Sequence, residues 1–307
     1  MIFYKKLVDN LVILLYNYLR TNANFYGLER LRLGFLCKKR IKSVILLNKK
    51  CLKTLDMPRL FVTKDQIDDG KVTLLGDDAH HVSRSLRMAA GEQIVVCDMQ
   101  KNEYTCVLDE FLPDRVTANI ISESKSDTEP LYYASLYQAL PKGDKLDSII
   151  QKAVECGVSS ITTFNSERCI AKDKDDGDKK LLRRQRIALE AAKQSGRGII
   201  PEVKPTVSFK EAVARAASAD IALFCYEGDS TEPLKSFLTK KRSELRQNCV
   251  NEPTVSIVIG SEGGFSLAEV EFAREHGLVP VGLGKRILRT ETASGFVLAC
   301  LCYEMEL

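Results

Sequence analysis

Residues Val255–Phe265 read VSIVIGSEGGF, an apolar run that ends in three closely spaced glycines, Gly260, Gly263 and Gly264. The run predicts a buried strand, and Ser266 is the expected N-cap of a following helix. Because glycine allows positive φ and close approach of the backbone, and ligands of open α/β sheets bind beyond strand ends, this is a candidate ligand loop. A tight turn without a ligand is the simpler alternative. The spacing is neither GxGxxG nor GxxxxGK, which excludes the dinucleotide and P-loop motifs.

A second glycine-containing turn lies within Val281–Ala293, which reads VGLGKRILRTETA. A short predicted strand is followed by the cations Lys285, Arg286 and Arg289 and then by a helix. Thr290 is the expected N-cap of that helix, and an acidic residue in its first turn suits the helix dipole. Three cations beside a second glycine loop indicate a site for a polyanion, with helix capping plus solvated charge as the alternative.

The chain from residue 131 onward alternates between strand-like and helix-like segments. The expected strands are Leu131–Leu140, Ile161–Phe164, Ile221–Tyr226, Val255–Gly260 and Val279–Leu283. The expected helices are Asp144–Cys156, Lys179–Ser195, Thr231–Gln247, Leu267–His276 and a C-terminal helix after Thr290. Such alternation predicts an α/β fold in which helices cover a mostly parallel sheet.

The preceding segment, from Arg59 to about Ser124, is rich in short strand-like runs separated by Asp, Gly and Pro. The runs are Arg59–Val62, Val72–Leu75, Gln93–Asp98, Tyr104–Leu108 and Val116–Ile121. One or two helical turns around His80–Met88 interrupt them. Many short strands in so few residues predict a small β-barrel. The expected boundaries are therefore an extension over 1–56, a barrel over 57–126 and an α/β domain over 127–307.

The charge of the chain is unevenly distributed. The net charge is +4, but residues 1–56 hold 12 Lys and Arg against 3 Asp and Glu, so the rest is net acidic. Any RNA contact of the main body must therefore come from a local patch. We expect residues 1–56 to be a dispensable extension or a mis-assigned start upstream of Met57. A basic RNA-binding arm is the alternative.

The cysteines and histidines indicate neither a metal centre nor export. The 10 cysteines are scattered without CxxC spacing, and there are 3 histidines, so no metal site is expected. Free thiols in this number suit a reducing compartment and predict a cytoplasmic location. No apolar run reaches the roughly 18 residues of a membrane span, so no membrane association is expected.

The two glycine loops closely resemble the C-terminal signature loops of SPOUT-class RNA methyltransferases. They are most similar to those of the 16S rRNA (uracil-N3)-methyltransferase family, RsmE. Further matching motifs are PRLFV from Pro58, HHVSRSLRM from His80, QALPKGDK from Gln138, QKAVECGV from Gln151, NSERC from Asn165 and QSGR from Gln194. The resemblance spans about residues 57–307. One departure is Ser261, where the family usually has proline; it predicts a more flexible loop and weaker cofactor binding.

This resemblance implies both a fold and a reaction. The implied fold is a SPOUT α/β trefoil-knot domain over 127–307, preceded by a PUA-like RNA-recognition β-barrel over 57–126. The implied reaction is S-adenosylmethionine-dependent methylation of uracil N3 in 16S rRNA of the small ribosomal subunit. Members act as homodimers with the active site near the dimer interface.

The resemblance also assigns site residues. The expected cofactor contacts are Leu140, Gly260, Glu262, Gly263, Gly264, Leu283, Gly284 and Leu288, with a core role equally open for Leu140. Arg289 is the candidate cation that stabilises a uracil anion, and Glu291 the weaker candidate for a base, with helix capping as its alternative. The expected RNA contacts are Arg59, His80, Arg84, Arg87, Arg168 and Arg197. For each of these, a solvated or ion-paired structural role is the alternative.

Two other functions stay open from the sequence. One is a SPOUT methyltransferase that acts on a ribose 2′-hydroxyl of tRNA or 23S rRNA. The other is a non-catalytic RNA-binding assembly factor, which the intact glycine loops and the RTET run disfavour. Analysis of the methylated nucleoside separates the first of these from uracil methylation, and a cofactor titration tests the second.

Overall fold

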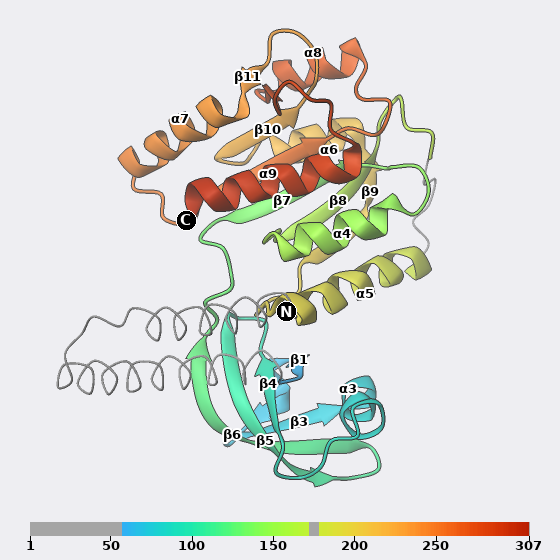
Figure 1. Cartoon of the computed structure of the whole chain (residues 1–307), viewed down its shortest axis with the longest axis vertical. Coiled ribbons are helices and arrows are strands. Elements are labelled where there is room, and N and C mark those ends of the chain that lie inside the picture. The colour runs from blue at the N-terminus through green and yellow to red at the C-terminus, as the bar shows by residue number, and fades with distance from the viewer. Residues whose placement is uncertain (1–56, 172–177, 307) are drawn as a thin grey trace, which may run out of the picture. The chain divides into compact units, whose positions relative to one another are not determined.

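The structure is a computed structural model that describes residues 57–171 and 178–306. The hypotheses about residues 1–56 lie outside the described residues. Within them, the secondary structure divides into a first, mainly antiparallel part and a second part in which strands and helices alternate (Figure 1).

A six-stranded sheet forms the first part. Its strands are β1 (Arg59–Phe61), β2 (Ile67–Asp68), β3 (Lys71–Leu75), β4 (Gln93–Cys97), β5 (Asn102–Phe111) and β6 (Arg115–Lys125). They are ordered β1-β4-β5-β6-β3-β2, and only the β1–β4 pair is parallel. Two register shifts interrupt the β5–β6 pairing, after Thr105 and after Leu108. Such irregularities bend and twist a long hairpin.

This sheet curls around a core of its own. Leu60 of β1 and Leu74 of β3 are fully buried in one hydrophobic cluster, although their strands lie near opposite ends of the sheet. Val82 completes the cluster from a π turn (His81–Ser85) that follows helix α3 (Gly76–His80). The helical segment expected near residue 80 therefore exists, but it begins four residues earlier than predicted.

A seven-stranded parallel sheet forms the second part. Its strands are β7 (Tyr133–Ala139), β8 (Ser160–Asn165), β9 (Glu202–Ser208), β10 (Ile221–Cys225), β11 (Glu232–Pro233), β12 (Thr254–Ile259) and β13 (Val279–Gly282). They are ordered β11-β13-β10-β12-β7-β8-β9, and every pair is parallel. The prediction of a parallel α/β sheet is confirmed.

Helices cover both faces of this sheet. They are α4 (Lys145–Glu155), α5 (Asp178–Ser195), α6 (Phe209–Ala216), α7 (Leu234–Gln247), α8 (Leu267–Glu275) and α9 (Thr290–Met305). Consecutive residues of β8 and β12 are buried, which requires cover on both sides of a strand. Helix α9 packs between α4 and α7 in one layer, while α6 and α8 meet through Phe209 and Phe272 (Figure 1).

Strand β9 and helix α6 of this region were not predicted from the sequence. Pro205 lies inside β9, which disguises a strand because proline cannot donate to a central ladder. β9 is the last strand in the sheet order, where proline is tolerated. The helix that follows begins after Ser208, whose hydroxyl accepts from the amide of Glu211.

The helix expected to start near Thr231 begins instead at Leu234. Pro233 is its N-cap, and together with Glu232 it pairs with β13 as the short strand β11. Proline favours extended backbone in the residue before it, which explains the later start.

Within the described ranges, no helix is long and apolar enough to cross a membrane. The trefoil knot that the family resemblance implies stays a prediction.

Candidate active site

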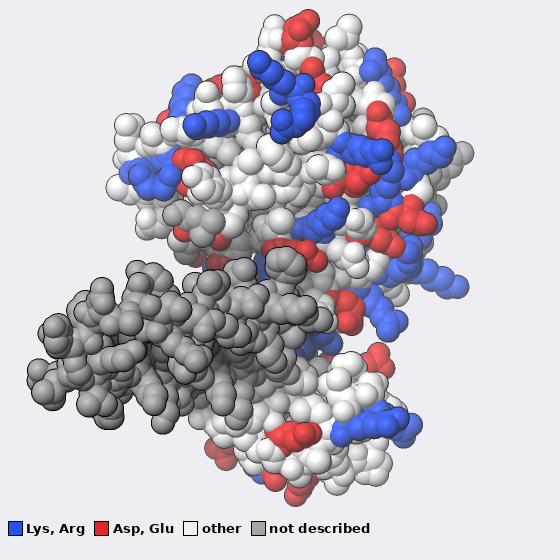
Figure 2. Space-filling model, viewed as in Figure 1, with Lys and Arg blue, Asp and Glu red and all other residues white. Residues whose placement is uncertain are grey.

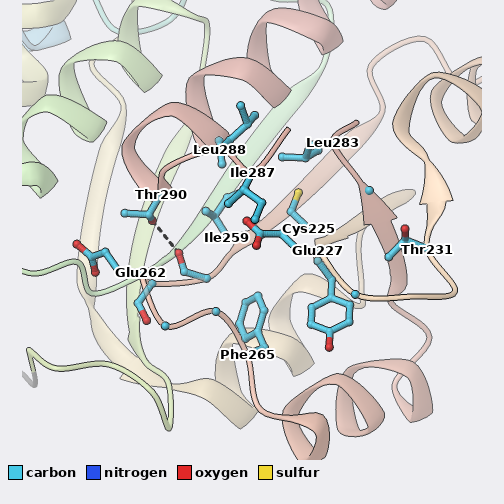
Figure 3. A pocket seen from close by; sticks show the side chains of 18 of the residues that line it. Cys225, Glu227, Thr231, Ile259, Glu262, Phe265, Leu283, Ile287, Leu288 and Thr290 are labelled. Atoms are coloured by element: carbon cyan, nitrogen blue, oxygen red, sulfur yellow. Dashed lines mark hydrogen bonds between the residues drawn. The ribbon is translucent and has the colours of Figure 1, made fainter. Parts of the chain in front are cut away.

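A pocket of 460 Å³ lies at the carboxyl edge of the parallel sheet (Figure 3). The neighbouring strands β13, β10 and β12 end side by side there, and the loop after each contributes to the lining. The loops supply residues 226–228 and 231, 260–265, and 283–288. Three adjacent parallel strands thus place three loops around one cavity, the usual position for a ligand in an open α/β sheet.

Most of the predicted cofactor residues meet in this pocket. The lining includes Gly260, Glu262, Gly263, Gly264, Leu283, Gly284 and Leu288. Leu140 is not among the lining residues: it is 4 % exposed, and its amide donates to the carbonyl of Phe164 at 3.0 Å. The structure thus places Leu140 in the core role that the sequence left open.

Steric contacts explain why the lining contains so many glycines. A Cβ atom on Gly282 would lie 2.7 Å from the Thr231 hydroxyl, and one on Gly260 would lie 3.1 Å from the Phe265 ring. Gly284 has a φ of +109°, a left-handed conformation that other residues rarely adopt. At these glycine positions the loops therefore line the cavity with backbone atoms.

A buried hydrogen-bond chain ties the first glycine loop to the helix after the second. The Thr290 hydroxyl donates to the carbonyl of Gly260 at 2.7 Å, the dashed line in Figure 3, and accepts from Gln138 at 2.9 Å. Thr290 was expected to be the N-cap of α9. The N-cap is instead Arg289, whose backbone is extended, and the Thr290 side chain bonds the neighbouring loop.

Aromatic packing fixes the first glycine loop to the core of the domain. Phe265 is 3 % exposed, and its ring centroid lies 4.3 Å from that of Phe224 in β10. The polar glycine segment is therefore held against the core by the residue that follows it.

Sequence reasoning missed the contribution of the loop after β10. Glu227 points into the pocket, and the thiol of Cys225 lines its wall (Figure 3). Burial raises the pKa of the Cys225 thiol to about 12, so it is protonated at neutral pH. No sequence motif marks this loop, and the position of β10 between β12 and β13 emerges only from the sheet order.

Cations stand at the mouth of the pocket. Lys285 and Arg286 are exposed lining residues from the second glycine loop. Arg168 is also an exposed lining residue, and its Nη1 donates to the carbonyl of Gly263 at 3.3 Å. The structure thus places Arg168 beside the first glycine loop, and its contact with RNA stays a prediction.

The two candidate catalytic residues lie beside the pocket rather than in its lining. The Arg289 side chain is 83 % exposed, and its Nη1 lies 3.9 Å from Glu291 Oε1. Lys145 Nζ lies 3.7 Å from Glu291 Oε2 and 2.7 Å from Glu262 Oε1. Two carboxylates and two cations from three elements therefore form one cluster next to the glycine loops.

Within this cluster, Glu262 and Lys145 shift each other's pKa values. Partial burial would raise the pKa of Glu262, but hydrogen bonds from Lys145 and main-chain amides outweigh it and lower that pKa. The same hydrogen bond raises the pKa of Lys145. Both groups therefore stay charged at neutral pH.

The residues of the first part that were expected to contact RNA separate into two groups. His80, Arg84 and Arg87 are exposed on the first part of the chain. Arg59 is different: its side chain is 14 % exposed and lies 2.8 Å from Glu103.

Arg197 corrects the prediction of an RNA contact most clearly. It is 3 % exposed, lies 2.6 Å from Glu129, and donates to the carbonyls of Val154 and Val158. A guanidinium enclosed in this way is a structural ion-pair partner, which was the alternative for it.

Lys and Arg do not gather into one large patch on the face that Figure 2 shows. They are interspersed there with Asp and Glu. RNA contact by this face would rest on local groups of cations, in agreement with the net charge of the chain outside residues 1–56.

Comparison with known proteins identifies the family. A family model described as an RNA methyltransferase domain matches residues 128–302, and one described as an RNA methyltransferase PUA domain matches residues 74–121. The chain belongs to this RNA methyltransferase family. It is 35 % identical over 255 residues to the ribosomal RNA small subunit methyltransferase E of Bacillus subtilis, covering 82 % of this chain and 98 % of that relative.

Further relatives of the family agree in sequence and structure. A protein of the same name from Synechocystis is 32 % identical over 242 residues, 78 % of this chain and 76 % of the relative. The crystal structure of a ribosomal RNA small subunit methyltransferase E from Neisseria gonorrhoeae, bound to S-adenosyl methionine, superposes with a TM-score of 0.69. That chain is 30 % identical, with 80 % of this chain and 97 % of that chain covered.

The pocket fits the cofactor of this methyltransferase family. Its volume lies within the roughly 300–1,000 Å³ typical of small-molecule sites. The glycine loops offer main-chain donors and acceptors, and Glu227 supplies a carboxylate, which suits ribose hydroxyls. Among the described residues, no group of three or more His, Cys, Asp or Glu could hold a metal ion.

Proposed function

We propose that this protein methylates N3 of a uracil in 16S rRNA of the small ribosomal subunit, with S-adenosylmethionine as the methyl donor. The observation that carries the proposal is the three-loop pocket. The chain that holds it matches, over most of their length, relatives named ribosomal RNA small subunit methyltransferase E. A cytoplasmic location fits such a substrate.

The pocket would bind and orient the cofactor. S-adenosylmethionine supplies an activated methyl group when bound. Main-chain groups of Gly260, Gly263, Gly264 and Gly284 are the natural hydrogen-bonding partners, since these lining residues have no side chain of their own to cover them. The Thr290 bond to Gly260 holds one of these loops in place.

The protein must also remove the N3 proton of uracil, because N3 is a poor nucleophile while it is protonated. In our proposal the Glu291 carboxylate accepts that proton, and the Arg289 guanidinium stabilises the negative charge that develops on the base. Their separation of 3.9 Å supports a joint action. Lys145, at 3.7 Å from Glu291, keeps the carboxylate beside the pocket.

RNA contacts are assigned to the exposed side chains alone. These are His80, Arg84 and Arg87 on the PUA-like part and Arg168 at the pocket mouth. The target base must be unpaired or flipped to enter a pocket of this kind.

A homodimer is part of the proposal. Helix α9 is apolar on several sides, with Phe296 37 % and Tyr303 72 % exposed. An apolar helix face of this kind suits burial against a second copy. Light scattering should give twice the chain mass, and Tyr303→Glu should reduce it to a monomer. A monomeric parent protein would contradict the dimer.

The test of the reaction uses the purified protein, labelled S-adenosylmethionine and small subunits that lack their native methylation. After digestion of the RNA, the label should elute as 3-methyluridine from 16S rRNA. Arg289→Ala should slow single-turnover methylation about a hundred-fold without changing cofactor affinity, since it acts on developing charge.

Other results of that experiment select the alternatives. Label in a ribose-methylated nucleoside would keep the cofactor site and replace uracil as the target. Absence of label, together with no cofactor binding in a titration, would leave an RNA-binding assembly factor.

A further inference from the structure

A buried carboxylate lies behind the pocket and has no part in the proposed chemistry. Glu269 is the third residue of α8 and is 7 % exposed. Burying a carboxylate is costly unless hydrogen-bond donors surround it. Its Oε2 accepts from the amide of Ser266 at 3.0 Å and from the hydroxyl of Ser166 at 3.1 Å. Its Oε1 accepts from the amide of Glu167 at 2.8 Å.

Helix capping accounts for only one of these three bonds. The Ser266–Glu269 pair forms a capping box, in which the side chain of the third residue returns to the N-cap amide. The other two bonds reach the loop after β8, about one hundred positions earlier in the chain. The carboxylate therefore joins two loops as well as capping a helix.

The loop that Glu269 holds carries Arg168. This loop is closed on itself, since the amide of Cys169 donates to the carbonyl of Ser166 at 3.1 Å. It also packs tightly on the first glycine loop: a Cβ atom on Gly263 would lie 3.0 Å from both the Cβ and the carbonyl oxygen of Arg168. Together with the 3.3 Å bond from its guanidinium to Gly263, this contact fixes where Arg168 stands at the pocket mouth.

We propose that Glu269 is a positioning residue, whose single carboxylate holds the Arg168 loop against the glycine loop so that the arginine is presented to the RNA beside the cofactor pocket. The proposal rests on the proposed function, because Arg168 acts there on the RNA. Glu269 itself touches neither substrate nor cofactor.

Two serines allow the positioning role to be separated from capping. Ser166→Ala removes one bond to Glu269 from the Arg168 loop and leaves the capping box intact. Ser266→Ala removes the bond that the Glu269 amide donates to the Ser266 hydroxyl and leaves the loop contacts intact. Both serines are buried, so the two variants lose comparable hydrogen bonds and serve as matched controls.

The experiment compares these variants with Arg168→Ala, Glu269→Gln and the Ser166→Ala/Arg168→Ala double variant in the full chain. Methylation of unmethylated small subunits gives kcat/KM, and hydrogen exchange gives the protection of residues 166–169. Ser166→Ala should lower kcat/KM about five-fold and raise exchange in that loop. Ser266→Ala should lower the melting temperature as much as Ser166→Ala does, but it should leave kcat/KM unchanged.

The double variant decides whether the serine acts through the arginine. If it does, Ser166→Ala should cost nothing further once Arg168 is absent. Additive losses, equal activity of the two serine variants, or full activity of Arg168→Ala would each overturn the positioning role. Because it relies on the serine pair, this test holds even if Glu269→Gln fails to fold.

Failure of the proposed function has a different signature. The labelled nucleoside made by the unmodified chain shows whether uracil N3 is the target. If another nucleoside is methylated, the serine comparison is read on that product and still decides the role of Glu269. If no RNA is methylated, unchanged exchange of residues 166–169 in Ser166→Ala refutes the clamp, and raised exchange there, absent in Ser266→Ala, supports it.

Discussion

At the scale of single residues, Gly263 shows how little space the pocket leaves. Its φ lies outside the left-handed range, so conformation alone would permit alanine. The obstacle is Arg168, whose Cβ and carbonyl oxygen would lie 3.0 Å from a new Cβ atom. A contact of that length forces the two loops apart by a few tenths of an ångström.

We therefore expect Gly263→Ala to weaken S-adenosylmethionine binding about five- to ten-fold, a loss of roughly 1–1.4 kcal/mol. Isothermal titration measures it. Gly295→Ala in helix α9 is the control, because a Cβ atom on Gly295 would meet only Lys152, at 4.0 Å. That variant should bind normally and gain about 0.5–1 kcal/mol of stability. Equal affinity for both variants would contradict the steric argument.

At the scale of elements, helices α4 and α5 of the α/β part both end at glycines with positive φ. Gly157 follows α4 with a φ of +86°, and Gly196 follows α5 with a φ of +74°. A Cβ atom on Gly157 would lie 2.7 Å from Pro130, whereas one on Gly196 would meet nothing within 4 Å. The two helix ends thus share conformation and differ in packing.

Alanine at the two positions should separate these effects. Gly196→Ala should cost about 1 kcal/mol of unfolding free energy through left-handed strain alone. Gly157→Ala should cost about 1–3 kcal/mol more, because the added methyl overpacks against Pro130. Urea unfolding measures both. Similar costs at the two sites would mean that Pro130 moves aside freely.

The neighbouring strands β10 and β12 are joined at their beginnings by Asp220. Its carboxylate accepts from the amide of Thr254 at 2.8 Å and from the hydroxyl of the same residue at 2.7 Å. The amide bond first, and then the hydroxyl bond, lower the pKa of Asp220 below its ordinary value of 3.8. A carboxyl with a depressed pKa stabilises the fold above its unfolded-state pKa, and loses this effect as pH falls through the folded-state value.

We expect Asp220→Asn to be less stable than the parent at pH 7 and at pH 5 by the same amount. Below about pH 3.8 the difference should shrink, because the parent carboxyl then becomes protonated too. Urea unfolding at pH 7, 5 and 3 tests this. A difference that stays constant down to pH 3 would show that charge on Asp220 is irrelevant.

At the scale of the whole molecule, Arg197 and Arg84 differ in environment, since one is buried in an ion pair and the other is exposed to solvent. Arg197 is enclosed with Glu129, which also accepts from the amides of Gly198 and Ile199. Removing the guanidinium would leave a buried carboxylate without its counter-charge. Arg84 is exposed on the PUA-like part.

Arg197→Met should therefore cost about 3–5 kcal/mol of unfolding free energy. Arg84→Ala should change stability by less than about 0.5 kcal/mol and lower the salt dependence of RNA binding by about one charge. Denaturant unfolding and RNA titrations at several salt concentrations measure the pair. If Arg197→Met were fully stable but impaired in RNA binding, the structural assignment of Arg197 would fail.

Local patterns in the sequence were sufficient for the architecture of the α/β part and for most of the pocket. Apolar periodicity, the glycines of the two loops and the Ser266 N-cap depend on backbone conformation within a few residues. The structure reproduces them in β12, β13 and α8. The family motifs added the cofactor and the reaction, which local physics alone does not specify.

Only the tertiary structure decided which polar groups meet. Arg197 pairs with Glu129 across 68 positions of the chain, and Ser166 bonds Glu269 across 103. The bonds of Thr290 to Gly260 and Gln138 likewise join segments far apart in sequence. Hydrophobic period and turn chemistry are local, whereas the partner of a buried polar side chain depends on which distant segments fold against it. For that reason the sequence by itself determined where the two glycine loops lie, whereas the folded chain added the third pocket loop and determined what holds all three.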